Sequence, residues 1–168
     1  GENPSQMKGF FWPKQSYNDE VNDRRRPVEK VTWFDCVGFC NKFSEKEGLK
    51  KAYTITGEDV LCDFAANGYR LPTEWEWFYA ARANQDFLYA GSNNIDEVAW
   101  YKENSNWDSK PVGQKKANGF GLYDMCGNVS EWCWDWYSYY SSGSAADPVG
   151  SKGTNRVVRG GSWSNDAR

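Results

Sequence analysis

Apolar side chains recur at helical spacing soon after Thr32. Thr32 and Asp35 have the spacing of a capping box, in which each side chain accepts a backbone N–H of the other's turn. Gly48 suits the end of a helix because glycine tolerates the left-handed conformation found there. The pattern therefore predicts a helix from Thr32 to about Gly48. Its expected apolar stripe consists of Cys36, Phe39, Cys40 and Phe43.

Two further elements follow along the chain. Residues 52–62 contain two β-prone runs on either side of Gly57, which predicts a hairpin. A second helix is expected just after Pro72, because Thr73 and Glu76 repeat the capping-box spacing. Its buried face is predicted to consist of Trp77, Ala80 and Ala81.

From residue 83 onward the pattern is mostly polar and rich in Asn, Gly and Ser. Short β-prone runs at 87–90, 97–101 and 156–159 are the strand candidates in this part. Two short helices beside short antiparallel strands, with about half of the chain irregular, predict an α+β fold. At 168 residues, the chain is expected to form a single domain over residues 1–168.

Composition indicates how such an irregular fold acquires a core. Aromatic residues are 17% of the chain, with ten Trp, ten Tyr and nine Phe. Large flat side chains bury much area, but their N–H and O–H groups need hydrogen-bond partners. The net charge of −3 gives no electrostatic reason to expect nucleic acid as a partner. No apolar run approaches the roughly 18 residues that a membrane-spanning helix needs, so no membrane span is expected.

Histidine is absent, which removes the commonest general base and any His-ligated zinc or iron site. The five cysteines include no Cys-x-x-Cys pair, and their odd number argues against a complete disulfide framework. They are expected to act mainly as small buried hydrophobes. These cysteines are Cys36, Cys40, Cys62, Cys126 and Cys133.

Several separated motifs resemble the formylglycine-generating-enzyme (sulfatase-modifying factor) family, which has a variant of the C-type lectin fold. The motifs are Val31-Thr-Trp-Phe-Asp35, Arg70-Leu-Pro-Thr-Glu-Trp-Glu-Trp77, Gly119-Phe-Gly-Leu-Tyr-Asp124, Gly127-Asn-Val-Ser-Glu-Trp132 and Arg159-Gly-Gly-Ser162. Their order is that of the family, and they extend over nearly the whole chain. The resemblance implies a C-type-lectin-like fold from which an opening strand and the closing strands are expected to be missing.

The resemblance also implies a structural calcium ion. The matching positions are the carboxylates of Asp124 and Glu131 and the backbone carbonyls of Gly127 and Val129. Hard carboxylate and carbonyl oxygens form the shell that Ca²⁺ prefers, and the Gly-Asn turn between the carboxylates can direct carbonyls inward. Alternatively, both carboxylates accept hydrogen bonds from loop amides. Asn128-Val-Ser130 is also a glycosylation sequon, although the segment is expected to be buried.

The family's oxidase depends on two cysteines shortly after the Arg-Gly-Gly-Ser block, which act as soft ligands for Cu(I). Here the first position matches Asn165, and the second is expected beyond Arg168. A carboxamide does not replace a thiolate, so no catalytic residue is assigned. The alternative is a copper-dependent formylglycine-generating oxidase, acting on a sulfatase cysteine, whose own cysteines are placed differently.

The C-terminal residues combine an aromatic ring with hydroxyl, amide and charged groups, as antibody paratopes do. They also resemble the variable proteins of diversity-generating retroelements, including treponemal ones, which diversify this end of the same fold. We therefore expect a non-catalytic ligand-binding protein, displayed outside the cell or on its surface, whose ligand is a protein or another surface molecule. A further alternative is an envelope or stress accessory protein that uses the fold only for protein contacts. The expected ligand-binding residues are Trp163, Ser164, Asn165, Asp166 and Arg168.

Overall fold

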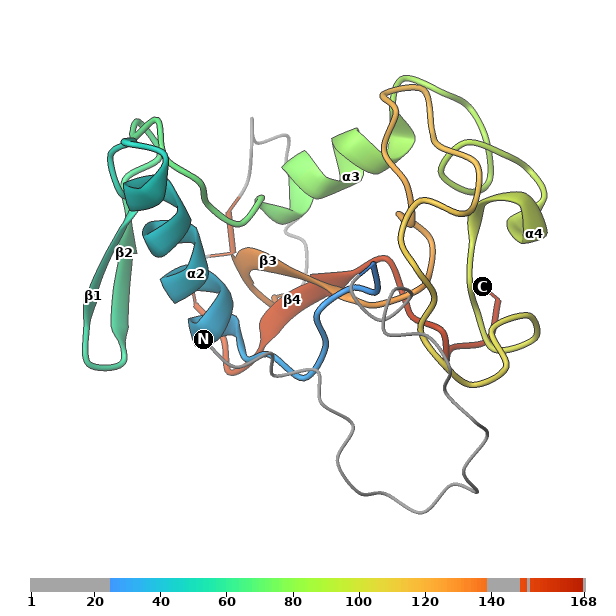
Figure 1. The fold of residues 1–168 in the computed structure, drawn as a ribbon. Coiled ribbons are helices and arrows are strands. Elements are labelled where there is room, and N and C mark those ends of the chain that lie inside the picture. The colour runs from blue at the N-terminus through green and yellow to red at the C-terminus, as the bar shows by residue number, and fades with distance from the viewer. Residues whose placement is uncertain (1–24, 139–148, 151, 168) are drawn as a thin grey trace, which may run out of the picture. The chain divides into compact units, whose positions relative to one another are not determined.

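The computed structural model describes residues 25–138, 149–150 and 152–167. These residues form an α+β arrangement of short elements joined by long loops, as predicted (Figure 1). Strands β1 and β2 pair with each other, and β3 pairs with β4. The elements are α2 (Trp33–Lys46), β1 (Tyr53–Thr56), β2 (Asp59–Cys62), α3 (Glu74–Arg82), α4 (Ile95–Val98), β3 (Glu131–Trp136) and β4 (Arg156–Arg159).

Helix α2 begins where the capping box predicted. The Thr32 hydroxyl accepts the Asp35 amide at 3.1 Å, and the Asp35 carboxylate accepts the Thr32 amide at 2.8 Å. The Thr32 bond lowers the pKa of Asp35. The helix ends at Lys46, and Gly48 follows in the left-handed region with φ of 70°.

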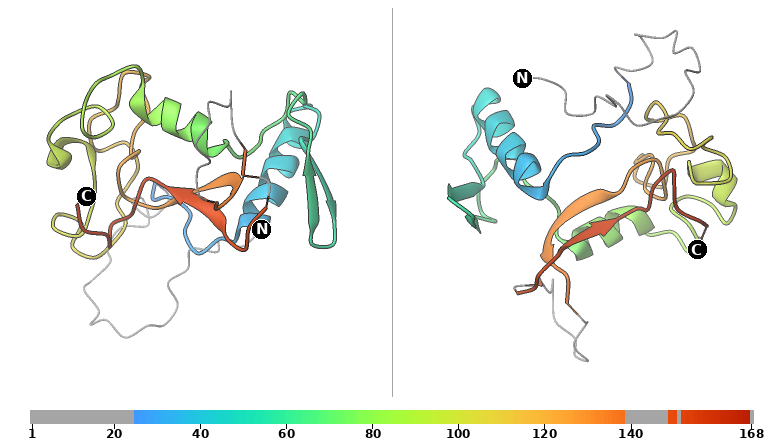
Figure 2. Two further views of the ribbon diagram at one scale, coloured as in Figure 1. Left: turned by 180° about the vertical axis from the view of Figure 1, so that it is seen from behind. Right: turned by 90° about the horizontal axis from the view of Figure 1, so that it is seen from below.

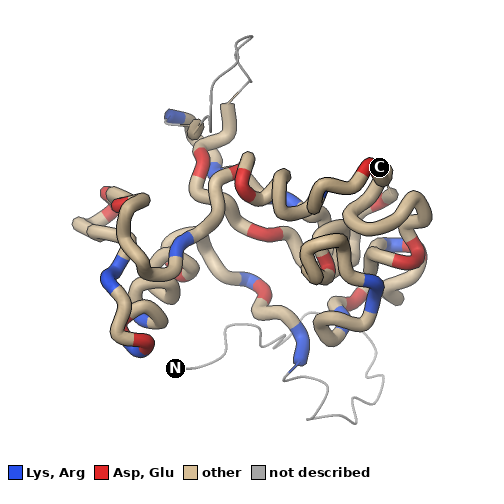
Figure 3. The backbone as a smooth tube through the Cα atoms, turned by 90° about the horizontal axis from the view of Figure 1, so that it is seen from above, with Lys and Arg blue, Asp and Glu red and all other residues tan. Residues whose placement is uncertain are grey.

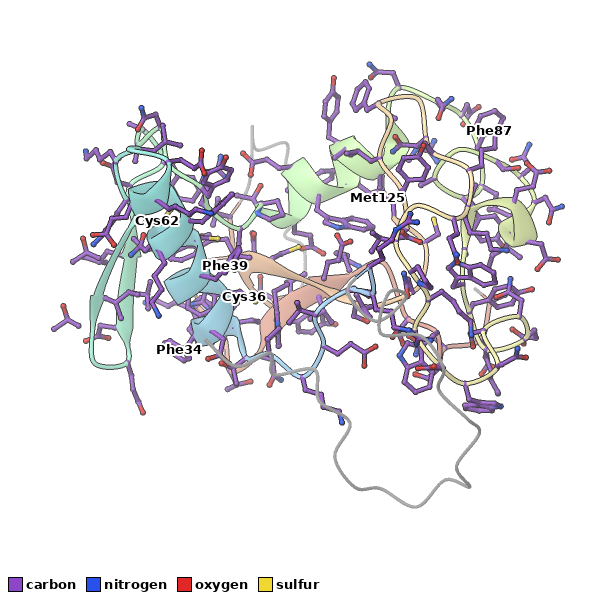
Figure 4. All side chains as sticks on the ribbon, viewed as in Figure 1. Phe34, Cys36, Phe39, Cys62, Phe87 and Met125 are labelled. Atoms are coloured by element: carbon purple, nitrogen blue, oxygen red, sulfur yellow. The ribbon has the colours of Figure 1, made fainter. Side chains whose placement is uncertain are left out.

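The buried face of α2 differs from the predicted stripe. Trp33, Val37 and Ser44 are the buried residues of the helix, and Cys40 packs against the core. Phe39 is 64% exposed and stacks on its helical neighbour Phe43 instead. Figure 4 labels Phe39 among the side chains of α2. The predicted buried face of α2 was thus wrong: the face that turns inward is rotated by about one residue from it. Trp33 buries more area than Phe39 and determines which side of the helix faces the core.

The hairpin prediction is confirmed. β1 and β2 pair antiparallel, with Tyr53 opposite Cys62 and Thr56 opposite Asp59. Gly57, in the connecting turn, has a φ of 62°. In all three ribbon views the hairpin runs alongside α2 (Figures 1 and 2).

The strand expected at 97–101 does not form. Instead, residues 95–98 form helix α4, because the Asn94 side chain accepts the Asp96 amide and caps a helical turn. Around the other short candidate, 87–90, a single bridge joins Tyr89 to Ser92. Local capping therefore overrides the β-prone composition of this loop. None of the helices in the described part of the chain has the length and apolar character that a bilayer crossing demands.

Within the described residues, the fold consists of two compact units. The first contains residues 25–30, 76–131 and 158–167. The second contains residues 31–75 and 132–157, without the undescribed positions. Each unit combines segments that are distant in sequence. The expected single domain over 1–168 stays a prediction.

The core of the second unit is built on tryptophan. Trp33 is buried, its indole N–H donates to the Cys133 carbonyl at 3.0 Å, and its ring lies 5.3 Å from that of Trp134. Val37, Ala52 and Tyr53 complete this cluster. The need for a partner at the indole tip is thus met by the backbone of β3.

Arg156 of β4 lies among the same rings. Its guanidinium carbon is 3.7 Å from the ring centroids of both Trp33 and Trp136, and one of its N–H groups donates to the Trp134 carbonyl. Burial lowers the pKa of Arg156 to about 10, and Asp135 opposes that shift. Charged residues of both signs are interspersed over the described chain (Figure 3), but this cation lies between aromatic faces.

Replacing Arg156 with lysine should therefore destabilise the protein. Lysine keeps the charge but loses the flat group that stacks between two rings, so we expect the free energy of unfolding to fall by about 1–3 kcal/mol. Urea denaturation monitored by circular dichroism measures this. Arg82→Lys is the matched control, because its ion pair with Asp86 is exposed and should change stability by less than about 0.5 kcal/mol. Equal effects of the two substitutions would contradict the stacking argument.

Candidate functional site

The segment from Asp124 to Glu131 belongs to the first unit and has a conformation that its sequence explains. A Cβ atom on Gly127 would lie 2.4 Å from the Trp100 carbonyl oxygen, so only glycine fits there. Asp124 and Asn128 have φ of 59° and 68°, a region that Asp and Asn tolerate better than other non-glycine residues. Met125, labelled in Figure 4, is buried within the same segment.

Asn128 connects this segment to three others. It is 1% exposed, and its amide donates to the Trp100 carbonyl at 2.7 Å. Its side chain accepts the Lys110 amide at 2.9 Å and donates to the Lys110 carbonyl at 3.0 Å. Its own carbonyl accepts the Trp163 amide at 2.8 Å. One buried residue thus holds two loops and the C-terminal segment. A glycan on the Asn128 side chain would require its two bonds to Lys110 to open.

All four residues predicted to ligate calcium line one cavity of about 240 Å³ in the first unit. The cavity also contacts residues of two neighbouring loops. Its lining consists of Pro27, Val112, Gly113, Tyr123, Asp124, Gly127, Asn128, Val129 and Glu131. These four residues lie within eight positions of one another in the sequence, and the structure places them around one cavity.

The two carboxylates of this cavity are only partly satisfied. Asp124 Oδ2 accepts the Gly113 amide at 2.9 Å, whereas Oδ1 is buried and has no hydrogen-bond partner among the described residues. Glu131 Oε2 accepts the Trp77 indole N–H at 2.6 Å. Burial raises the pKa of Glu131; the Trp77 bond opposes the rise and the charge of Asp124 adds to it. A buried carboxylate oxygen without a donor is costly, and a cation would remove that cost.

No group of three or more Asp, Glu, Cys or His side chains in the described ranges is arranged to hold a metal. A cation in this cavity would therefore depend on two carboxylates together with backbone carbonyls. That donor set fits the predicted one and is suited to a hard ion such as Ca²⁺. The alternative prediction, that loop amides bind both carboxylates, holds in part, because Gly113 does donate to Asp124.

The predicted ligand-binding residues form the C-terminal segment of the first unit, residues 163–166; Arg168 lies outside the described residues. Its main chain is firmly held. Besides the Trp163 amide, the Trp163 carbonyl accepts the Ser105 hydroxyl at 2.8 Å and the Asn165 carbonyl accepts the Lys102 amide at 3.0 Å. The side chains of Ser164, Asn165 and Asp166 are exposed, and Trp163 is half-buried. In Figure 1, this red segment passes beside the yellow loop that contains Lys102.

Sequence reasoning missed the loop residues that hold this segment. Ser105 is fully buried and bonds to Trp163, and Lys102 forms an ion pair with Asp166 at 2.6 Å. Trp107 of the same loop is 56% exposed. The available signal was a single tryptophan in the polar run Asn104-Ser-Asn-Trp-Asp108.

Thiols are scarce around Asn165. Asn165 Oδ1 accepts the Ser162 hydroxyl at 2.9 Å, as an amide in a polar turn does. The single cysteine of the first unit, Cys126, accepts the Ala90 amide at 3.1 Å, and burial raises its pKa. All five cysteines are free thiols. Among the described residues of the unit that contains Asn165, Cys126 is thus the single thiol available as a soft ligand.

Comparison with known proteins identifies relatives of this fold. The family model of the sulfatase-modifying factor enzyme 1-like domain matches residues 1–168. The structure of variable protein 1 from Treponema denticola is similar, with a TM-score of 0.83 and 34% identity over 98% of this chain and 68% of that one. This similarity confirms the C-type-lectin-like fold of the formylglycine-generating-enzyme type.

Two curated proteins illustrate the range of relatives. A chaperone protein, LppX of Paenibacillus barcinonensis, is 41% identical over 97% of this chain and 63% of its own length. A formylglycine-generating enzyme of Streptomyces coelicolor is 37% identical over 94% of this chain and 49% of its own length. The chain therefore spans less than two thirds of either protein. The relatives include an enzyme and proteins named for other roles.

Asn128→Ala should destabilise the protein strongly. The change removes two buried side-chain hydrogen bonds and places alanine at a positive φ, so the free energy of unfolding should fall by about 2–4 kcal/mol. Chemical denaturation measures the loss. Asn106→Ala is the matched control, since Asn106 has a φ of 54° but is exposed. It isolates the backbone cost and should lose only about 1 kcal/mol. Equal losses for both variants would show that the bonds to Lys110 contribute nothing.

Proposed function

The chain belongs to the sulfatase-modifying factor enzyme 1-like family, and from this premise we propose that it is a non-catalytic binding domain with an exchangeable C-terminal surface. The observation that carries the proposal is the division of roles within residues 163–166. Their main chain is hydrogen-bonded to Asn128, Ser105 and Lys102, whereas the side chains of residues 164–166 face solvent. Side chains can be exchanged there without loss of the bonds that fix the backbone.

The similarity to a variable protein supports an exchangeable surface. We propose that the ligand is a protein, because one relative is named a chaperone protein, and a chaperone in general acts by contact with polypeptides. A display role outside the cell or at its surface follows from this proposal.

Diversification by a retroelement would leave a trace in the genome. Sequencing the locus in sibling isolates should show variation confined to the 3′ end, near a reverse-transcriptase gene; invariant 3′ ends without such a neighbour would count against it.

Calcium is the proposed structural ion of the supporting segment. The residues that would hold it are Asp124 and Glu131 through their carboxylates and Gly127 and Val129 through their carbonyls. The buried Asp124 Oδ1, which lacks a donor, supports this assignment. An ion there would stabilise the same segment that bonds to Trp163 through Asn128. The Asn128 carbonyl, which accepts the Trp163 amide, lies between the carbonyls of Gly127 and Val129 in the chain. Metal binding and ligand display would then be linked through neighbouring backbone groups.

The alternative is an oxidase like the related formylglycine-generating enzymes. Such chemistry needs two thiolates near the position of Asn165, and the first unit has one cysteine, which is bonded to the Ala90 amide. The available residues therefore support binding better than oxidation. An assay for the aldehyde product distinguishes the two functions.

Calcium should raise the melting temperature. At a calcium concentration one hundred times the dissociation constant, the expected stabilisation is about 2.7 kcal/mol, or about 5–10 °C for a chain of this size. Calorimetric titration gives the constant, and thermal melts with calcium or with EDTA give the shift. Glu131→Gln should weaken binding at least tenfold, whereas Glu103→Gln, in an exposed loop position, should not. Identical melts with calcium and EDTA would disprove the site. Burial raises the pKa of Glu131, so protons should compete with calcium for its carboxylate at a higher pH than for an ordinary glutamate. The affinity for calcium should therefore fall as the pH is lowered.

The exposed side chains of the C-terminal segment should be dispensable for folding. Replacing Ser164, Asn165 and Asp166 together with alanine removes one exposed ion pair and surface hydrogen bonds, so stability should change by no more than about 1 kcal/mol. Ser105→Ala is the contrasting variant, because it removes a buried bond to the Trp163 carbonyl; it should cost about 1–3 kcal/mol. A triple variant less stable than Ser105→Ala would contradict the division of roles.

The oxidase alternative predicts an aldehyde. We expect none when the protein is incubated with Cu(I), oxygen and a peptide containing Cys-x-Pro-x-Arg, with mass spectrometry of the peptide as the readout. A known formylglycine-generating enzyme is the positive control. Formation of formylglycine by this chain, above the level of copper alone, would overturn the proposal of a non-catalytic scaffold.

A further inference from the structure

Trp107 has two properties that are individually uncommon for a tryptophan. Its side chain is 56% exposed, and its backbone has a φ of 56°, directly after Asn106 with a φ of 54°. A bulky residue in the left-handed region is an outlier, and an exposed indole gains little from burial. Neither property stabilises the fold. Strained positions of this kind concentrate where side chains contact ligands.

Hydrogen bonds hold Trp107 beside the C-terminal segment. Its amide donates to the Ser105 hydroxyl at 3.2 Å, and that hydroxyl donates to the Trp163 carbonyl at 2.8 Å. The amide of Lys102, at the start of the loop, donates to the Asn165 carbonyl. All of these partners in the C-terminal segment are main-chain atoms. Exchange of side chains 164–166 therefore leaves these bonds between the Trp107 loop and the C-terminal segment in place.

Charge also links the indole to the exchangeable residues. Lys102 Nζ lies 2.6 Å from the Asp166 carboxylate and 5.9 Å from the centre of the Trp107 ring. Asp166 raises the pKa of Lys102 through this contact. Trp107, Lys102 and residues 164–166 thus form one continuous surface, which we call the anchor face.

We propose that Trp107 is a fixed aromatic anchor of the anchor face and that the ligand class is a polypeptide. This rests on the proposed binding function and adds a specificity-determining residue to it. Interfaces between proteins concentrate their energy in a few aromatic residues surrounded by a polar rim. The anchor face has that composition, with Trp107 beside Ser164, Asn165 and Asp166.

The arrangement of polar groups argues for a polypeptide rather than a sugar. The Ser162 hydroxyl is 3.1 Å from the Ser164 hydroxyl and donates to the Asn165 side chain, and Asp166 pairs with Lys102. These groups are bonded to one another, which leaves fewer free donors and acceptors for sugar hydroxyls. On the anchor face Lys102 and Asp166 form an ion pair, and the carboxylate of Glu103, next to Lys102 in the sequence, also acts on Lys102, so a basic ligand side chain that stacks on Trp107 is the favoured contact.

The test is selection of a phage library of random twelve-residue peptides on the immobilised full chain. We expect enriched peptides containing lysine or arginine, and binding is then measured by fluorescence polarisation with synthetic peptides. Trp107→Gly should weaken binding at least tenfold. The same variant should melt at an unchanged or higher temperature, because glycine tolerates the positive φ. A merely structural role of Trp107 predicts the opposite, a lower melting temperature.

Tyr79→Ala is the matched control, because Tyr79 is 58% exposed in the same unit but packs on Phe120. It should change affinity less than twofold. Loss of binding in the triple alanine variant of residues 164–166 with none in Trp107→Gly would overturn the anchor and leave the proposed function intact. Insensitivity to both variants would overturn the proposed function as well. Failure to enrich any peptide, or binding to a glycan array instead, would overturn the polypeptide assignment.

Discussion

The bonds of one buried residue, Asn128, connect everything that we propose this chain to do. Its backbone φ of 68° suits asparagine, its side chain binds both polar backbone groups of Lys110, and its carbonyl holds the Trp163 amide. Each bond joins segments that are distant in the sequence. Because a buried polar group without its partner is costly, each of these bonds helps to stabilise the burial of Asn128. The positions of the cavity and of the C-terminal segment therefore depend on the same residue.

Aromatic side chains stabilise the irregular backbone in a second way, through their polar tips and faces. Trp33 donates to Cys133, Trp132 donates to the Val31 carbonyl, and Trp77 donates to Glu131. Arg156 packs between the faces of Trp33 and Trp136 and donates to the Trp134 carbonyl. A chain with few regular elements has many loop carbonyls that need donors. An indole supplies a donor together with a large apolar surface, and Trp33, Trp77 and Trp132 use both.

Features determined by neighbouring residues were predictable from the sequence. The capping box of α2, the hairpin around Gly57 and the bounds of β4 at 156–159 depend on local spacing and were confirmed. The candidate metal residues also lie close in sequence, and they do line one cavity. The role of Ser105 was not predictable, because its partner Trp163 is 58 residues away. Likewise, the inward face of α2 depends on where Trp33 finds room, and helical periodicity alone does not decide between adjacent faces.

The same architecture suits both catalysis and recognition, because both need a C-terminal segment of fixed backbone. The resemblance implies that an oxidase would hold thiolates in this segment, whereas the side chain of Asn165 bonds within its own turn. Its carbonyl is held by Lys102 regardless of which side chain it carries. Under the proposed function, an amide at Asn165 stands in place of a reactive thiol while the backbone scaffold of the segment remains. A binding surface needs no more than that scaffold and an exposed anchor, and the strained, exposed Trp107 beside it matches the requirement for an anchor.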